Sequence, residues 1–153
     1  MDLDVTDLKI LAILQREGKI TNTELASRIN LSPSPCLARV RRLEKSGMIS
    51  NYVALVSPAL AGLELNVFIF ITLKAQNREK LKNFEERIGS YDEVMECYLM
   101  TGEDDYLLRV LMRDVSSLER FIIDKLSPIP EVEHIRSSIS LKQVCYKTVL
   151  PLA

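Results

Sequence analysis

Two helices predicted near the N-terminus are separated only by Asn30-Leu31, so the chain must turn tightly between them. The first helix opens at residues 21–24, Thr-Asn-Thr-Glu, which have the form of a capping box. The second opens at Ser32, a favourable N-cap, and has Pro33 in the first helical position. Asn tolerates the left-handed backbone that such turns often need. The spacing therefore predicts a helix-turn-helix over about residues 22–41.

The second of these helices is predicted to have two different faces and to stop at Gly47. Its apolar residues recur at intervals of three and share one face: Leu37, Val40 and Leu43. The opposite side carries small and basic residues: Ser34, Ala38, Arg41, Arg42 and Lys45. Most charge runs on helices are ordinary solvated faces, but this one follows a tight turn and suits contact with DNA.

A third amphipathic segment supplies the helix that covers the pair. It runs from Asp4 to Gln15, and its apolar residues are Leu8, Ile10, Leu11 and Leu14. The first helix of the pair, from about Asn22 to Ile29, adds its own apolar residues: Leu25, Ala26 and Ile29. Three such helices suffice for a small core.

The charge of the chain is close to neutral but unevenly distributed. Residues 1–60 carry 8 Lys and Arg against 6 Asp and Glu, a net +2, whereas residues 61–153 carry 12 against 15, a net −3. Between Ser32 and Gly47, four basic residues face one acid. The positive field is therefore local to the second helix of the pair.

After a turn-rich stretch ending at Gly62, the pattern changes to alternating strands and helices. The predicted order is βαββαβ, a ferredoxin-like arrangement, so the whole chain is placed in the α+β class with domains 1–62 and 63–153. The predicted elements are a strand at 65–74, a helix at 78–88, strands at 94–100 and 106–112, a helix opening at Ser116 with a capping box and stopping at Pro128, and a last strand at 132–146.

The first of these strands carries apolar side chains on both faces. Val67 and Ile69 alternate with Phe68 and Phe70. Because the helices of such a sheet cover one face only, the second face needs another cover, and the economical one is a second copy of the sheet. We therefore expect a homodimer.

Motifs along the whole chain resemble the Lrp/AsnC (feast/famine) transcriptional regulators. The most specific is the Ser-Pro-x-Pro-Cys entry to the second helix at residues 32–36. The resemblance also rests on Asp7 to Leu11, Gly18 to Thr21, Glu24 to Ala26, Arg39 to Glu44, Gly47 to Ile49, Tyr52 to Leu55, Pro58 and Thr101 to Leu108. It implies a (winged) helix-turn-helix domain, a linker strand at residues 52–55 and a ferredoxin-like effector and oligomerisation (RAM) domain.

The resemblance also implies function: a sequence-specific regulator that binds double-stranded DNA and responds to a small amino acid effector, built as a homodimer and commonly an octamer. On the second helix, the expected DNA contacts are Ser32, Ser34, Ala38, Arg39, Arg41, Arg42 and Lys45. Since the family lives in prokaryotic cells, the chain is expected in the cytoplasm, on the nucleoid.

The second expected site is the acidic turn between two strands. From the residues alone, Gly102 and three acids form an ordinary solvated hairpin turn. In a functional interpretation, carboxylates here receive the ammonium group of a free amino acid and turn N–H groups receive its carboxylate. The resemblance implies an effector site at this turn, between dimers. The expected effector residues are Leu99, Thr101, Gly102, Glu103, Asp104, Asp105, Val115, Ser138, Ile139 and Ser140.

Other chemistry has little support. The cysteines Cys36, Cys97 and Cys145 lack a disulfide or metal spacing and are expected as buried small hydrophobes. The acidic turn lacks the spacing of a calcium loop, so neither a metal nor a cofactor is expected. The single histidine, His134, is expected in a strand rather than in catalysis. Met95, Met100 and Met112 are expected in the core, and no segment suits a membrane span or a signal peptide.

Two alternatives share much of this pattern. A nucleoid-like architectural protein would bend DNA without a ligand and would use the same basic helix. A tetrapyrrole decarboxylase on the same architecture would need histidines or arginines around a large pocket, and this chain offers one histidine. We therefore expect that this chain is not an enzyme.

Overall fold

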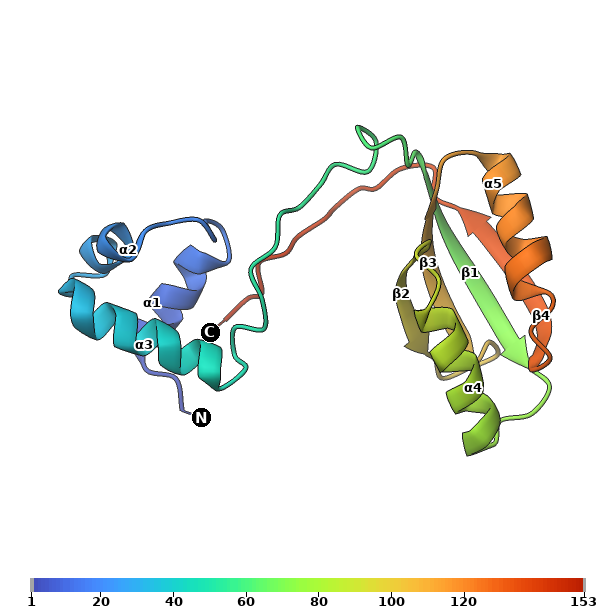
Figure 1. The fold of residues 1–153 in the computed structure, drawn as a ribbon, viewed down its shortest axis with the longest axis horizontal. Coiled ribbons are helices and arrows are strands. Elements are labelled where there is room, and N and C mark those ends of the chain that lie inside the picture. Colours follow the sequence, from blue (N-terminus) through green and yellow to red (C-terminus); the bar gives the residue numbers. More distant parts are fainter. Residues whose placement is uncertain (1, 153) are drawn as a thin grey trace. The chain divides into compact units, whose positions relative to one another are not determined.

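The computed structural model describes residues 2–152 and divides into two compact units (Figure 1). The first runs to Leu55 and also includes the chain from Val144 onward, while the second is Val56–Gln143. The sequence placed a single boundary between residues 62 and 63. The C-terminal segment joins the first unit because Leu150 N–H donates to Gln15 Oε1 at 2.6 Å and Gln15 Nε2 donates to Leu150 O at 3.5 Å.

Three short helices form the first unit: α1 (Val5–Leu14), α2 (Asn22–Arg28) and α3 (Pro33–Lys45). The turn between α2 and α3 contains Asn30 with φ 57°, the left-handed conformation that its position predicted. Seven buried side chains form the core of the unit: Ile10, Leu11, Leu25, Ala26, Ile29, Cys36 and Leu43. The predicted helix-turn-helix is present.

The buried face of α3 differs from the predicted one by one residue. Leu43 is buried and Val40 packs against the core, but Leu37 is 37% exposed while Cys36 is fully buried. Cys36, Val40 and Leu43 are spaced i, i+4 and i+7, which keeps them on one stripe of a 3.6-residue helix, whereas Leu37 lies to its side.

Helix caps were predicted in part. Thr21 Oγ1 accepts the N–H of Glu24 at 3.2 Å, but the Glu24 carboxylate pairs with Arg28 at 2.5 Å and so does not complete a capping box. Ser32 is the N-cap of α3 without a side-chain hydrogen bond. A complete capping box lies instead at α1, between Asp4 and Asp7.

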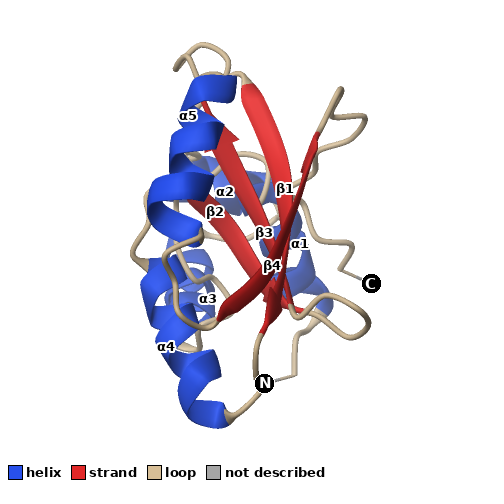
Figure 2. Cartoon of the chain, turned by 90° about the vertical axis from the view of Figure 1, so that its right-hand side faces the viewer, coloured by secondary structure: helices blue, strands red, loops and turns tan. Residues whose placement is uncertain are grey.

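The second unit has the predicted βαββαβ order. Its elements are β1 (Leu65–Leu73), α4 (Arg78–Gly89), β2 (Val94–Leu99), β3 (Tyr106–Met112), α5 (Val115–Arg120), the π-helical segment η1 (Phe121–Leu126) and β4 (Val132–Ile139). The sheet order is β2-β3-β1-β4 and every pairing is antiparallel. Figure 2 shows α4 and α5 on the same side of the sheet.

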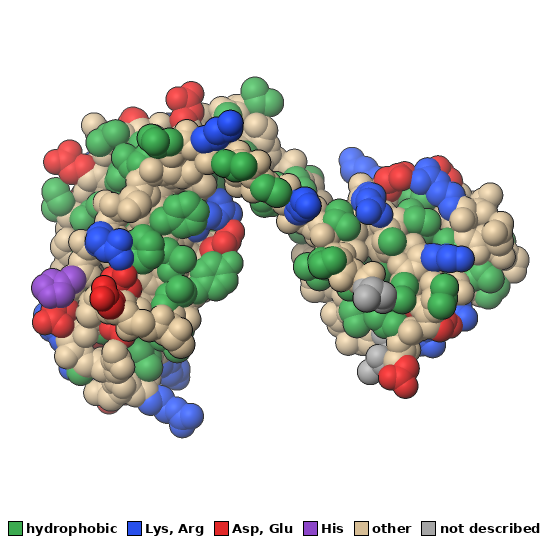
Figure 3. Space-filling model, turned by 180° about the vertical axis from the view of Figure 1, so that it is seen from behind, with side chains coloured by type: hydrophobic (Ala, Val, Ile, Leu, Met, Phe, Trp, Pro, Cys, Tyr) green, Lys and Arg blue, Asp and Glu red, His purple; other side chains and the backbone are tan. Residues whose placement is uncertain are grey.

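Alternation along β1 divides the sheet into a covered face and an open one. Val67, Ile69 and Ile71 are fully buried under the helices, where Phe84 of α4 packs against Tyr106 with ring centroids 4.6 Å apart. The residues between them remain half-buried on the other face: Asn66, Phe68, Phe70 and Thr72. Figure 3 views this open face and shows hydrophobic side chains gathered at its centre, with charged groups among them.

Two predicted element boundaries are wrong, and one expected strand does not form. The cap of α5 is Asp114, whose carboxylate accepts the N–H of Ser117 at 2.6 Å, rather than Ser116. The last strand ends at Ile139 rather than Tyr146, because its partner β1 starts at Leu65 and offers no backbone beyond it. The linker strand expected at residues 52–55 is not formed, because these residues make no ladder of backbone hydrogen bonds with another strand in the described part of the chain.

Side-chain burial corrects two further expectations. Cys36 is buried, but Cys97 and Cys145 are exposed. Met112 is buried as predicted, whereas Met95 and Met100, at the sheet edge and its turn, are about two-fifths exposed, at 43% and 41%. No helix between residues 2 and 152 has the length and apolar character needed to cross a bilayer.

Candidate functional site

A free polar stripe runs along α3, opposite its buried face. Ser34, Ala38, Arg41 and Lys45 are all exposed, and their spacing of i, i+4, i+7 and i+11 aligns them along the helix. Within the described residues, no carboxylate lies at ion-pair distance from Arg41 or Lys45. This stripe, which we call the α3 stripe, therefore presents two uncompensated positive charges to solvent.

The other two arginines of α3 are held against α1. Arg39 Nη1 donates to Asp4 Oδ2 at 2.6 Å and to Asp7 Oδ1 at 2.9 Å, and Arg42 Nη2 donates to Asp7 Oδ2 at 2.5 Å. The Asp7 side chain is fully buried. One carboxylate thus joins two guanidinium groups one turn apart, and we call Asp4, Asp7, Arg39 and Arg42 the α1–α3 clamp.

Asp4 is stabilised as a carboxylate within this clamp. The Asp7 N–H, which donates to Asp4 Oδ1 at 2.8 Å, and then Arg39 hold the pKa of Asp4 below its usual value. The same two carboxylates raise the pKa of Arg39. Sequence reasoning missed Asp4 and Asp7 as partners of the basic helix; their spacing, an acidic N-cap with an acid three residues later, is a capping-box signal that could have located the box but not its contact with α3.

At the acidic turn of the second unit, Asp105 is an interior residue. Its Oδ2 accepts the Leu73 N–H at 2.7 Å, its Oδ1 accepts from Gln76 Nε2 at 2.5 Å, and its own N–H donates to Ile71 O at 2.9 Å. Only 7% of the residue is exposed. Asp105 thus closes the end of β1 and has both carboxylate oxygens occupied by protein donors.

The remaining acids of the turn differ in availability. Asp104 pairs with Arg136 of β4 at 2.5 Å, whereas Glu103 is exposed and forms no ion pair with any described residue. Gly102 has φ 127°, a backbone conformation that favours glycine. Across residues 2–152, the N–H groups of Gly102, Glu103 and Asp104 donate to no backbone acceptor. The turn can therefore offer one free carboxylate and a set of free N–H groups.

The expected effector residues lie at two opposite ends of the sheet. Leu99 and residues 101–105 are at the end where Ile71 pairs with Tyr106. Val115 follows the far end of β3, and residues 138–140 lie beside Phe68 and Asn66 at that same far end. Figure 1 shows the β2–β3 turn and the start of α5 at opposite ends of the sheet. One protomer does not bring these two sets together.

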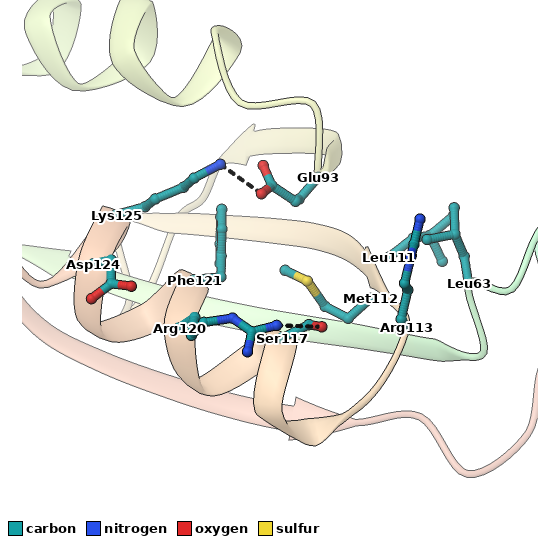
Figure 4. Close-up of a pocket in the computed structure, with 10 residues that line it drawn as sticks. All are labelled: Leu63, Glu93, Leu111, Met112, Arg113, Ser117, Arg120, Phe121, Asp124 and Lys125. Carbon is teal, nitrogen blue, oxygen red and sulfur yellow. Dashed lines mark hydrogen bonds and ion pairs between the residues drawn. The ribbon is translucent and has the colours of Figure 1, made fainter.

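A groove of about 400 Å³ opens at the far end, where β3 leads into α5 (Figure 4). Phe121 and Met112 form apolar parts of its wall, and Lys125 Nζ contacts Glu93 Oε1 at 2.6 Å. Burial acts to raise the pKa of Glu93, but the hydrogen bond from Lys125, a backbone N–H and the charge of Lys125 together outweigh it and hold the pKa below its usual value. The groove shares no residue with the expected effector set.

Groups suited to metal binding or catalysis are scarce. No cluster of three metal-ligating side chains occurs between residues 2 and 152. His134 lies in β4, as predicted, and is exposed. Cys97 is exposed as a residue, but desolvation of its thiol by the protein packed around it, with the nearby charge of Glu85, raises its pKa to about 11 and makes it a poor nucleophile.

Comparison with known proteins matches both units. Residues 3–50 match the family model for a winged helix-turn-helix DNA-binding domain, and residues 66–150 match that for the Lrp/AsnC ligand binding domain. The leucine-responsive regulatory protein of Rhizobium meliloti (strain 1021) is 39% identical over 144 residues, which cover 94% of this chain and 92% of that protein. The protein of the same name from Escherichia coli (strain K12) is 38% identical over 143 residues, covering 94% and 87%.

Solved structures agree along the full chain. A transcriptional regulator from Neisseria meningitidis, crystallised as a complex with L-Met, superposes with a TM-score of 0.93 at 39% identity and covers 98% of this chain and 97% of its own. An AsnC family transcriptional regulator from Agrobacterium tumefaciens gives 0.93 at 35% identity, covering 97% of each chain. These likenesses confirm the α+β class, with a winged helix-turn-helix followed by an α+β domain.

Proposed function

This chain belongs to the Lrp/AsnC family of DNA-binding transcriptional regulators with an amino-acid-binding domain, and we propose that it meets double-stranded DNA through the α3 stripe. The observation that carries this proposal is the pair of uncompensated charges at Arg41 and Lys45, on the second helix of a helix-turn-helix. That helix is the one that enters the major groove in this motif. Ser34 and Ala38 on the same stripe are short enough to let the helix approach the bases.

Arg41→Ala with Lys45→Ala is expected to weaken binding to all DNA sequences alike. Each lost phosphate contact lowers the slope of log affinity against log salt concentration by about 0.9, so the double variant should lose about 1.8 per protomer. Fluorescence anisotropy on one duplex at several salt concentrations measures this slope. Arg87→Ala, an exposed arginine of α4, is the matched control. An unchanged slope in the double variant would remove the α3 stripe as the DNA surface.

We also infer a homodimer formed by the open faces of two sheets. Asn66 Oδ1 on this face has no hydrogen-bond partner among the described residues. The Glu96 carboxylate and its two donors are paired within one protomer, since Arg109 Nε donates to Glu96 Oε1 and the Tyr98 hydroxyl to Glu96 Oε2, both at 2.7 Å. A second sheet could therefore cover the face without leaving these groups unpaired. Two recognition helices related by a two-fold axis can read half-sites about 34–36 Å apart.

The effector is proposed to bind between copies of the chain. Because Glu103 and Val115 lie at opposite ends of one sheet, a site that uses both needs the turn of one protomer against the far end of another. Such a head-to-tail contact repeats until it closes into a ring. An octamer made of four dimers satisfies this requirement, and free N–H groups of the turn are suited to an amino acid carboxylate.

L-methionine and L-leucine are the first probes, because one similar regulator was crystallised with L-Met and other relatives are named leucine-responsive. A ligand at 100 times its Kd stabilises the protein by about 2.7 kcal/mol, and a thermal-shift measurement detects this. Glu103→Gln should abolish the shift without changing the stability of the free protein. Arg120→Ala, in the groove of Figure 4, is the control. Loss of the shift in that control alone would move the effector to the groove.

We propose that this chain acts on the prokaryotic nucleoid, as a regulator rather than as an enzyme. A ligand-independent architectural protein would use the same α3 stripe. Silence toward every amino acid in the thermal-shift measurement, together with binding that does not discriminate sequences at fixed salt, would favour that second function.

A further inference from the structure

We propose that Asp7, together with Asp4, cancels the charge of Arg39 and Arg42 and fixes their positions, so that these two arginines discriminate between DNA sequences while Arg41 and Lys45 supply the general attraction. This inference rests on the proposed DNA contact of α3. It assigns a role in DNA recognition to a buried acid of α1, a helix that carries none of the expected DNA contacts. Asp7 is thus a positioning residue and suppresses binding to unrelated sequences.

The geometry of the α1–α3 clamp carries the proposal. Both oxygens of the fully buried Asp7 carboxylate contact guanidinium groups, at 2.9 Å for Arg39 and 2.5 Å for Arg42. Asp7 is itself held in place, since its N–H donates to Asp4 Oδ1 and its Oδ2 accepts the Asp4 N–H at 3.2 Å. Two long side chains therefore adopt their positions before DNA arrives, and less side-chain entropy is lost on binding.

The charges of the clamp balance. Asp4 and Asp7 contribute two negative charges, and Arg39 and Arg42 two positive ones. A neutral cluster attracts the phosphate backbone little and releases few counterions from it. On the same helix, Arg41 and Lys45 have no such partner among the described residues. The helix thus separates its basic residues into a compensated pair and a free pair.

The compensated arginines keep hydrogen-bond donors for a base edge. A guanidinium group has five N–H donors, and only Nη1 of Arg39 and Nη2 of Arg42 contact the clamp acids. The side chains remain 31% and 50% exposed, respectively. Arginine N–H groups recognise O6 and N7 of guanine in the major groove. Arginines that are fixed and neutralised can therefore recognise bases without binding strongly to the phosphates of unrelated DNA.

Asp7→Asn is the decisive variant. Asn keeps most of the shape and one acceptor oxygen but removes the charge, so Arg42 loses its ion pair and can reach a phosphate, while Arg39 keeps only its pair with Asp4. We expect tighter binding to unrelated DNA and a salt slope steeper by about 0.9 per protomer, because the clamp then carries one net positive charge. The preference for a selected site should fall by about 5- to 150-fold, the range for loss of a bidentate base contact. A residue that only stabilises the fold would instead weaken both kinds of binding.

The probes are a duplex enriched from a random-sequence library by the wild-type protein and a scrambled duplex of the same composition. Affinity for each is measured at four salt concentrations, on protein whose folding is checked by circular dichroism. Asp4→Asn keeps the experiment decisive if Asp7→Asn does not fold: Asn is an equally good N-cap, and Asp4 is half exposed. It should shift the slope and the preference in the same direction by a smaller amount.

Two outcomes separate this inference from the function beneath it. An unchanged slope and preference in folded Asp7→Asn and Asp4→Asn proteins would overturn the clamp proposal, even where Arg41→Ala with Lys45→Ala still weakens binding. If Arg41→Ala with Lys45→Ala has no effect, the assignment of the α3 stripe as the DNA-binding surface is itself wrong. A steeper slope with a lower preference supports both.

Discussion

Asp105→Ala is expected to lower the free energy of unfolding of the second unit by about 2–4 kcal/mol, because it removes the acceptor of a buried N–H and of a second donor. The buried donor is the backbone N–H of Leu73, at 2.7 Å, and the second is Gln76 Nε2. Leu73 is itself 4% exposed, so water does not replace the lost oxygen. Urea unfolding followed by circular dichroism measures the loss.

Two variants make this result interpretable. Asp105→Asn keeps one oxygen for the Leu73 N–H and should lose less stability than Asp105→Ala. Glu103→Ala, two residues away, should unfold at the wild-type urea concentration because its exposed side chain forms no ion pair within residues 2–152. Wild-type stability of Asp105→Ala, with loss of effector binding, would instead return Asp105 to the role of a ligand carboxylate.

The difference between Asp105 and Glu103 could not be predicted from the sequence. Both are acids in one short run, and a local pattern gives them the same role. What separates them is a hydrogen bond to a residue 32 positions away, at the end of β1. The pairing of β1 with β3 brings Leu73 next to Asp105, and the sequence of residues 101–105 alone does not reveal this contact.

Features that depend on neighbours in sequence were predicted well. The left-handed Asn30, the Pro33 start of α3 and the alternation of β1 all follow from local backbone and side-chain preferences. The βαββαβ order follows from the order in which strand-like and helix-like hydrophobic periods occur along the chain. Boundaries failed where a partner decides them, as at Ile139, whose strand stops with its neighbour β1.

The α3 helix shows the same limit at the candidate site. Its basic residues were all found from the sequence, but their division into a free pair and a compensated pair was not. Asp7 lies 35 positions from Arg42, on a helix whose own pattern indicates only packing. Leu37 was also assigned to the buried face of α3, where Cys36 lies instead, since a spacing of three and one of four fit a short helix almost equally well.

The open face of the sheet leads to the second large expected effect. Phe70 lies at its centre, paired with Leu107 on one side and Arg136 on the other, and the Arg136 guanidinium stands 4.1 Å from its ring centroid. If a second sheet covers this face, Phe70 becomes a fully desolvated aromatic anchor, the kind of residue that dominates interface energy. Its neighbours are half-buried and suit the same interface.

Phe70→Asp is therefore expected to raise the dimer dissociation constant by about a thousandfold or more, equivalent to about 4 kcal/mol, because it removes the aromatic anchor and would bury a carboxylate whose neighbour Arg136 already pairs with Asp104. Sedimentation velocity at micromolar concentration should then show a folded monomer, whereas the wild-type chain is expected to sediment as a dimer or as an assembly of dimers. Lys82→Asp on the exposed side of α4 changes charge without touching this face and should leave the dimer intact. Since the monomer presents one recognition helix, its affinity for a two-half-site duplex should also fall to that for a single half-site. A stable Phe70→Asp dimer would place the interface elsewhere and leave the open face without its proposed cover.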